Sequence, residues 1–103
     1  MEWIIAKHNS AFDGTLLDKV EGSPAAVRKL LVRMVNEDRA HEAADGDNSW
    51  DLGTENEEDV LELAEATLYA VGCYNDFHID YTAKPLEFMD LHVLDDTGHF
   101  IIR

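Results

Sequence analysis

The sequence has few cysteines, few basic residues and no long apolar run. Cys73 is the only cysteine, so no internal disulfide can form, and its apolar neighbours predict a small buried side chain rather than a nucleophile. No window approaches the roughly 18 apolar residues of a membrane span, and the first residues lack the basic and apolar regions of a secretory signal. Together these absences predict a protein of the reducing cytoplasm.

The motifs of common catalytic, phosphate-binding and metal sites are also missing. There is no G-x-S-x-G nucleophile elbow, no G-x-x-x-x-G-K-[ST] loop and no G-x-G-x-x-G fingerprint. Alternating acids between residues 45 and 51 are similar to the start of a calcium loop, but Trp50 and Asn56 stand where that loop needs Gly and Glu. We therefore expect a protein that is not an enzyme, with no cofactor and no metal site.

Basic residues are scarce beside the acidic ones. The chain has 8 Lys and Arg against 22 Asp and Glu, a net charge of −14 over 103 residues. Such an excess argues against direct contact with nucleic acid or anionic lipid, both of which attract basic surfaces. Residues 1–39 hold six acids and six bases, so the excess belongs to residues 40–103, and residues 42–65 contain ten acids and no base.

Apolar residues make up 46% of the chain, which is enough for the core of one domain spanning residues 1–103. Ser23 is a good N-cap and Pro24 suits a first helical position. A stripe at helical spacing follows, which predicts a long helix over residues 24–41: Val27, Leu30, Leu31, Met34 and Val35.

The remaining apolar runs predict strands. Turn-forming residues separate them, and Pro85 is expected outside any central strand. A capping box from Thr54 to Glu57 favours a second, short helix over residues 56–66, although Leu61 and Leu63 also alternate at strand period. The sum is an α+β domain, an antiparallel sheet packed by one or two helices. The expected strands are Trp3–His8, Thr15–Glu21, Leu68–Tyr74, Phe77–Thr82, Leu91–Leu94 and His99–Ile102.

A dense acidic surface either serves only to keep the protein soluble or is itself a function. Duplex DNA carries one negative charge per about 1.7 Å of its axis. If residues 57–65 are helical, their five acids average about one charge per 2.4 Å, and as a strand about half that density. If this surface is functional, we expect a protein-interaction domain that mimics DNA and inhibits a basic nucleic-acid-binding protein, with Leu52 and Tyr69 as apolar anchors and Trp50 as either a third anchor or a core residue. The expected protein-binding residues are Asp45, Asp47, Asp51, Glu55, Glu57, Glu58, Asp59, Glu62 and Glu65.

Two alternatives come from the second half of the chain. His78 and Asp80 lie two residues apart on an expected strand and so share a face, which can build a small metal-dependent or hydrolytic site, with His92 or His99 as a third member. The hairpin over residues 91–102 is apolar on both faces, so one face can join two copies in a homo-oligomer.

Short segments also resemble known proteins. Ile79-Asp80-Tyr81-Thr82-Ala83, with Asp90-Leu91 and Gly98-His99-Phe100, resembles the C-terminal end of acidic antirestriction proteins carried by conjugative elements. The opening Trp3-Ile4-Ile5-Ala6-Lys7-His8-Asn9-Ser10 is similar to small uncharacterised proteins of bacterial mobile elements. The resemblance implies a bacterial, mobile-element setting and inhibition of a DNA-processing enzyme. It assigns no functional residue.

Overall fold

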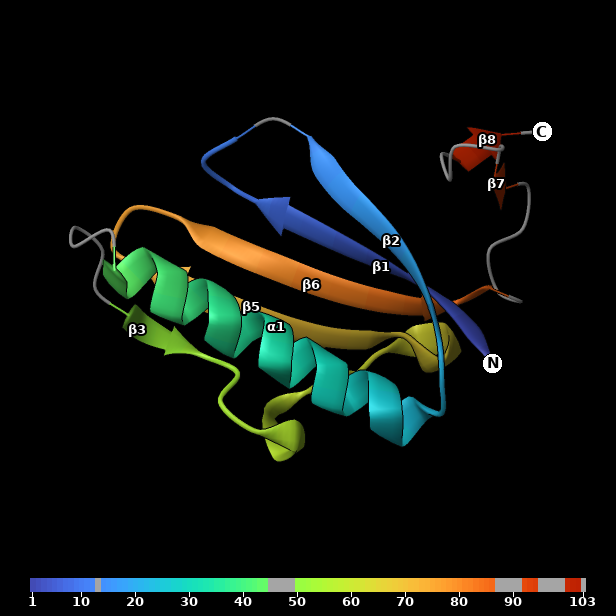
Figure 1. Cartoon of the computed structure of the whole chain (residues 1–103), viewed down its shortest axis with the longest axis horizontal. Helices are drawn as coiled ribbons and strands as arrows, with labels where there is room; N and C mark the ends of the chain where they lie inside the picture. The colour runs from blue at the N-terminus through green and yellow to red at the C-terminus, as the bar shows by residue number, and fades with distance from the viewer. Residues whose placement is uncertain (13, 45–49, 87–91, 95–99, 103) are drawn as a thin grey trace.

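The computed structural model describes residues 1–12, 14–44, 50–86, 92–94 and 100–102. Most of its strands form one antiparallel sheet in the order β2-β1-β6-β5-β3, with β4 also paired to β5 (Figure 1). These strands are β1 (Glu2–Asn9), β2 (Thr15–Glu21), β3 (Trp50–Gly53), β4 (Leu61–Glu62), β5 (Leu68–Tyr74) and β6 (His78–Pro85). A single long helix, α1 (Pro24–Ala44), packs on the sheet, so the expected α+β class is confirmed.

Helix α1 begins where the sequence predicts and runs three residues beyond the expected end. The Ser23 side chain accepts a hydrogen bond from the backbone N–H of Ala26 at 3.1 Å, which caps the first turn. Val27, Leu31 and Val35 are the fully buried residues of the helix and recur at every fourth position. Because residues four apart lie on one helix face, this stripe holds α1 against the sheet.

The core lies between α1 and one face of the sheet. Side chains alternate along a strand, so every second residue of β5 and β6 faces the helix. Leu68 and Ala70 of β5 and Ile79 and Tyr81 of β6 are buried there. The residues between them lie on the opposite face, which we call the open face: Tyr69, Val71 and Cys73 of β5 and Asp80 and Thr82 of β6, all half-buried. Cys73 is therefore only partly buried.

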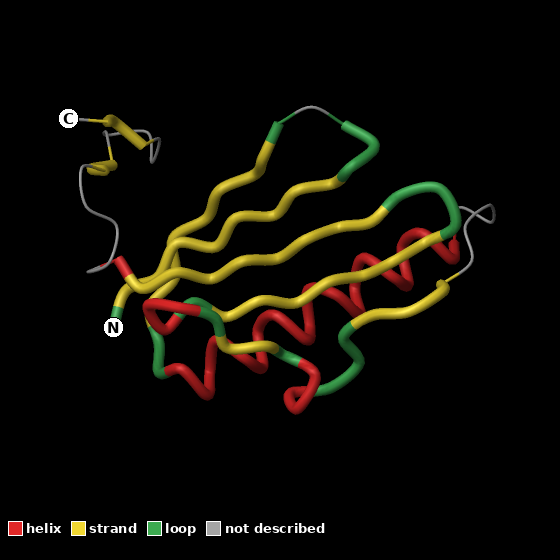
Figure 2. The backbone as a smooth tube through the Cα atoms, turned by 180° about the vertical axis from the view of Figure 1, so that it is seen from behind, coloured by secondary structure: helices red, strands yellow, loops and turns green. Residues whose placement is uncertain are grey.

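The helix covers only part of the sheet. It packs mainly on β5 and β6, while the β1–β2 hairpin extends past it (Figure 1). Seen from behind, β2, β1, β6 and β5 lie side by side, with the helix against one half of the sheet (Figure 2). Consistent with this, almost every residue of β2 is exposed. Among the described residues, none of the helical segments has the length and apolar character needed to cross a membrane.

The expected second helix over residues 56–66 is wrong. This segment forms a 3-10 turn, η1 (Glu57–Asp59), the short strand β4 and a second 3-10 turn, η2 (Ala64–Ala66). Leu61 and Glu62 pair with Tyr69 and Leu68 of β5, and Glu65 and Ala66 take positive φ angles that end any helix. Ladder hydrogen bonds to β5 thus replace local helical ones, and the charge spacing calculated for a helix does not apply.

Two further expectations on strands need correction. Pro85 is the last residue of β6, a central strand, where it lies opposite Trp3 of β1. Proline is tolerated at this position because β5 begins at Leu68, which lies opposite Ala83. At Pro85, β6 is therefore paired with β1 alone. Strand β3 was not expected; its pairing with β5 includes a shift of register between Trp50 and Leu52.

The expected C-terminal hairpin is present. Strands β7 (His92–Leu94) and β8 (Phe100–Ile102) pair with each other as a separate two-stranded sheet. Val93 lies opposite Ile101 in this ladder. The loop that was expected between them lies outside the described residues.

Candidate functional site

The acidic segment lies along one edge of the sheet, beside β5. Strands β3 and β4 both pair with β5, and the chain leaves the edge between them to form η1. Thr54 extends the ladder, since its backbone N–H donates to the carbonyl of Val71 at 2.8 Å and its hydroxyl accepts from the N–H of Val71 at 3.1 Å. The acids of this segment are called the acidic edge: Glu55, Glu57, Glu58, Asp59, Glu62 and Glu65. Of the other predicted residues, Asp51 lies in β3, and Asp45 and Asp47 lie outside the described residues.

Helix α1 holds the acidic edge in place through Arg28. The guanidinium donates to the backbone carbonyls of Glu57 at 3.2 Å and Val60 at 2.8 Å. Val60 itself is 3% exposed and belongs to the core. One buried side chain and two charge-assisted hydrogen bonds therefore fix a turn whose other residues are exposed.

Asp59 differs from the other acids because the fold uses its carboxylate. One of its oxygens accepts hydrogen bonds from the backbone N–H groups of Glu55 at 3.0 Å and Asn56 at 3.2 Å. Asn56 in turn accepts from the N–H of Glu58, which completes a capping box. The expected box between Thr54 and Glu57 is therefore wrong, because the hydroxyl of Thr54 is bound to β5.

The other acids divide into paired and unpaired groups. Glu55, Glu62 and Glu65 lie near bases from distant parts of the chain, and the three pairs measure 3.8–3.9 Å: Arg39–Glu55, Arg28–Glu62 and Lys84–Glu65. These carboxylates are well exposed, and exposed pairs this long contribute little. In the part of the chain that the structure describes, the carboxylates of Glu57 and Glu58 join no ion pair.

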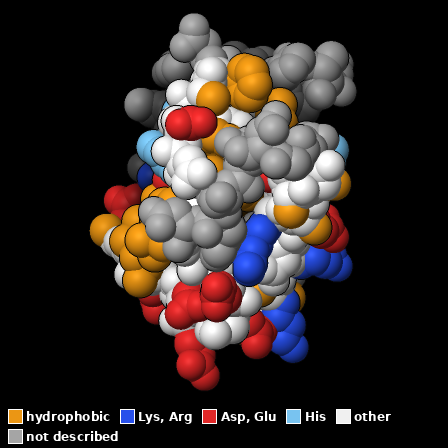
Figure 3. Space-filling view, turned by 90° about the vertical axis from the view of Figure 1, so that its left-hand side faces the viewer, with side chains coloured by type: hydrophobic (Ala, Val, Ile, Leu, Met, Phe, Trp, Pro, Cys, Tyr) orange, Lys and Arg blue, Asp and Glu red, His pale blue; other side chains and the backbone are white. Residues whose placement is uncertain are grey.

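Exposed leucines accompany the acids. Leu52, Leu61 and Leu63 are 63%, 55% and 47% exposed. Leu52 lies opposite Cys73 and Leu61 opposite Tyr69, so both adjoin the open face. Figure 3 looks onto the end of the molecule where β3 begins and shows acidic side chains gathered low on this end, with exposed hydrophobic ones to their left. Apolar side chains bordered by charge are typical of protein-binding surfaces.

A hollow separates the acidic edge from the helix. Its volume is about 300 Å³, and its lining includes Glu55 and Glu57 from the edge and Lys29 and Val32 from α1. The hollow is shallow and open to solvent, so a side chain of a partner can rest on it against Val32 and the charged groups that line it.

The predicted pair of His78 and Asp80 is present on the sheet surface. His78 Nε2 lies 3.2 Å from Asp80 Oδ2, and the other oxygen of Asp80 accepts a hydrogen bond from the hydroxyl of Tyr69. Asp80 therefore contacts both side chains and orients them. Within the described residues, no three His, Cys, Asp or Glu side chains come together as metal ligands. His92 lies in β7, and His99 lies outside the described residues.

The tyrosines make stability sensitive to high pH. Burial, and then the hydrogen bond to Asp80 and its charge, raises the pKa of Tyr69 to about 12. Burial, and then the charge of Asp38, raises the pKa of Tyr74 to about 12 as well. Because the unfolded chain loses these protons near pH 10 and the folded protein retains them, stability is full below pH 10 and falls as the pH rises toward 12.

We expect the urea midpoint to change little up to about pH 9 and to decrease more and more steeply from there to about pH 11.5, that is, from about 1 unit below to about 1.5 units above a tyrosine pKa near 10. The measurement is urea unfolding followed by tryptophan fluorescence at several pH values. Tyr69→Phe removes one of the titrating groups and should flatten the decrease. Equal slopes in the wild type and in Tyr69→Phe would contradict the role given to Tyr69.

The sequence prediction found the acids and one of the leucines but not the complete site. Leu52 was expected as an anchor, whereas Leu61 was expected only as part of a short helix or a strand and is 55% exposed. The alternation of Leu61 and Leu63 at strand period was the signal that pointed to the observed structure. Trp50 lies in β3, and Tyr69 is half-buried on the open face.

Comparison of the chain with protein-family models, with curated proteins and with solved structures finds no match.

Proposed function

We propose that this protein is a non-enzymatic interaction domain that uses its acidic edge and the adjoining leucines to bind a basic protein. The observation that carries the proposal is the placement of Glu57 and Glu58, exposed and without ion pairs in the described chain, on a turn that Arg28 and Val60 anchor to the core. A charged surface held in place in advance binds with less loss of conformational entropy than a mobile one.

The distribution of ion pairs supports a partner with positive charge. Besides the three bases at the acidic edge, Lys7, Lys19 and Arg33 each pair with an acid of this chain, at 2.8, 3.2 and 3.8 Å. In the described chain, six of the protein's eight Lys and Arg residues therefore already lie next to acids, while the net charge is −14. Compensation for that excess comes from outside the molecule, either from salt or from a basic surface.

The finer proposal is that the partner is a nucleic-acid-binding protein and that the acidic edge occupies its DNA-binding groove. The high negative charge and the resemblance to acidic antirestriction proteins support this form. Electrostatic attraction of this kind gives fast association that weakens as salt is added. The same features support a bacterial, cytoplasmic setting on a mobile element.

A competition experiment tests the proposal. A fluorescent DNA duplex is bound to each of a panel of bacterial restriction enzymes and other DNA-processing enzymes, and release of the duplex by this protein is followed by anisotropy. We expect the wild type to displace DNA from at least one enzyme of the panel, less effectively as salt rises. Reversing four charges of the acidic edge should weaken the displacement about 100-fold. The variant carries Glu57→Lys, Glu58→Lys, Glu62→Lys and Glu65→Lys.

A matched variant separates the site from the net charge. Its four substitutions change the net charge by the same amount as those of the test variant, but they lie away from the acidic edge. In both variants, two of the four replaced acids are in ion pairs. It should displace DNA within about tenfold of the wild type. Equal losses in both variants would show that only net charge matters, and a wild type that displaces no DNA would contradict mimicry. The matched changes are Glu2→Lys, Asp18→Lys, Glu21→Lys and Glu37→Lys.

A further inference from the structure

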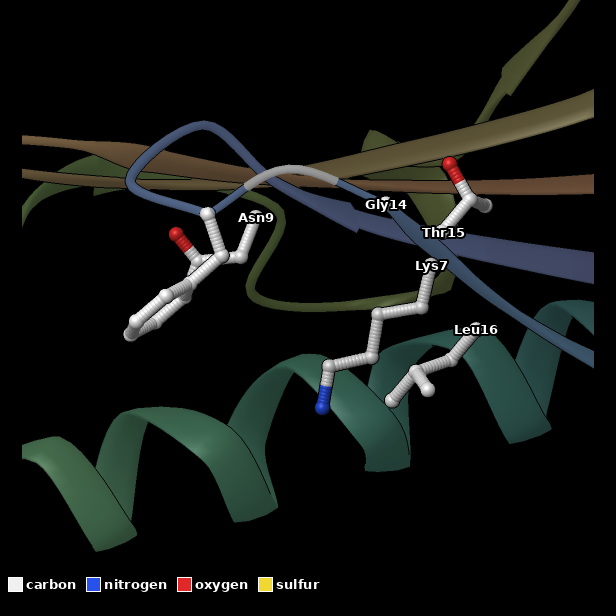
Figure 4. A pocket seen from close by; sticks show the side chains of 6 residues that line it. Lys7, Asn9, Gly14, Thr15 and Leu16 are labelled. Carbon is white, nitrogen blue, oxygen red and sulfur yellow. The ribbon is translucent and has the colours of Figure 1, made fainter.

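A second surface lies on the other side of the molecule from the open face, between the β1–β2 hairpin and α1. Because α1 packs mainly on β5 and β6, the side of β2 that faces the helix has nothing lying on it. Phe12 and Leu16 are 70% and 71% exposed at this place. We call this surface the hairpin groove, and Figure 4 shows Lys7 and Leu16 reaching across it toward the helix.

The hairpin groove consists of two adjoining hollows. The first, of about 470 Å³, is lined by Lys7, Asn9, Phe12, Gly14, Thr15 and Leu16. The second, of about 200 Å³, shares Lys7 and Leu16 and adds apolar side chains that include Met34 of the helix. Small-molecule sites in proteins have volumes of about 300–1,000 Å³, mostly apolar walls and a few polar groups. The groove has these properties.

The ammonium group of Lys7 is the one cationic group among the described residues that line the two hollows, and it is already paired with a carboxylate. Its Nζ lies 2.8 Å from Asp38 Oδ2, and the same oxygen accepts a hydrogen bond of 2.6 Å from the hydroxyl of Tyr81. Tyr81 is fully buried, so Asp38 is held from the core side and fixes Lys7 in turn. An ammonium has three N–H donors, and one contact with Asp38 leaves two for a ligand.

The charges in the groove indicate which end of a ligand lies where. Lys7, Asn9 and Thr15 provide donors in the first hollow, and Asp18 lines the second. An anionic group is therefore favoured beside Lys7 and disfavoured beside Asp18. The exposed ring of Phe12 offers a surface for stacking an aromatic ring.

We propose that the hairpin groove binds a small aromatic monoanion, a carboxylate or sulfonate, with the anion on Lys7 and the rings between Phe12 and Leu16. This site is separate from the acidic edge and does not depend on the function proposed for it. The two also differ in their response to salt. Because the whole protein repels anions, salt should strengthen binding in the groove, whereas it should weaken binding of a basic partner at the acidic edge.

Titration with two fluorescent probes tests the proposal. The first is 1-anilinonaphthalene-8-sulfonate, an aromatic sulfonate, and the second is N-phenyl-1-naphthylamine, which has the same rings and no charge. We expect the sulfonate to bind at one site per chain. Phe12→Ser with Leu16→Ser should weaken both probes about tenfold or more, because the apolar walls are lost. Lys7→Met should weaken the sulfonate about tenfold and leave the uncharged probe within about twofold.

Leu61→Ser is the matched control, since it removes an exposed leucine from the other apolar surface. It should leave both affinities unchanged. Because Phe12 and Leu16 are highly exposed, the double variant is expected to fold, and circular dichroism checks this. The double variant therefore tests the site independently of Lys7→Met. Absence of sulfonate binding, retention of binding in the double variant, or loss of binding in Leu61→Ser would overturn the proposal.

Discussion

Replacing Leu31 with alanine should lower the free energy of unfolding by about 3 kcal/mol. Leu31 is fully buried and lies at the centre of the helical stripe that faces β5 and β6. The substitution removes three methylene-sized groups from the core and leaves a cavity, because the helix and the sheet are held by other contacts and close only in part. For a domain of this size, such a loss is a large share of the total stability.

Urea unfolding at pH 7 measures this effect, with Leu16→Ala as the control. The two variants lose the same atoms, but Leu16 is 71% exposed, so its replacement should change stability by less than about 0.5 kcal/mol. Similar effects of the two substitutions would contradict the packing of α1 against the sheet.

Replacing Asp38 with alanine should lower the free energy of unfolding by about 2–3 kcal/mol. Its carboxylate accepts the hydrogen bond of the buried Tyr81 hydroxyl, and without Asp38 that hydroxyl loses its acceptor. Burial, and then this hydrogen bond, raises the pKa of Tyr81 above its usual value. The ion pair with Lys7 contributes less, because both side chains are about one-quarter exposed and water screens them.

A double-mutant cycle distinguishes the two contacts of Asp38. Tyr81→Phe removes the hydroxyl, so Asp38→Ala in that background leaves no donor without a partner. The double variant should therefore be more stable than the sum of the single effects indicates, by about 1 kcal/mol. Asp38→Asn keeps an acceptor and should lose less than Asp38→Ala. Additive effects in the cycle, measured by urea unfolding, would show that the hydrogen bond to Tyr81 contributes nothing of its own.

Local patterns predicted the elements whose stability comes from local contacts. Ser23, Pro24 and the apolar stripe that follows predicted α1 to within three residues of its end, because caps and helical spacing act within one segment. Hairpin strands were also predicted, since β1 and β2, β5 and β6, and β7 and β8 each pair with a neighbour in sequence. The α+β class followed from these elements.

Residues 50–66 were not predicted because distant partners decide their structure. The helical signal there, a capping box, competes with the edge of β5, which accepts a backbone hydrogen bond from Thr54 and pairs with Leu61. The turn that carries Val60 into the core is bound by the guanidinium of Arg28, which lies 32 residues earlier in the chain. No local pattern contains that information.

The sequence alone determined that the negative excess lies in the second part of the chain, because charge is a property of composition and needs no fold. Only the tertiary structure decided what each acid does. Asp59 caps a turn, whereas Glu62 lies beside Arg28 of α1 and Glu65 beside Lys84 of β6. Glu57 and Glu58 remain exposed because the fold brings these bases to other positions along the edge. The hairpin groove likewise exists because one helix covers only part of the sheet and leaves Lys7 at its floor.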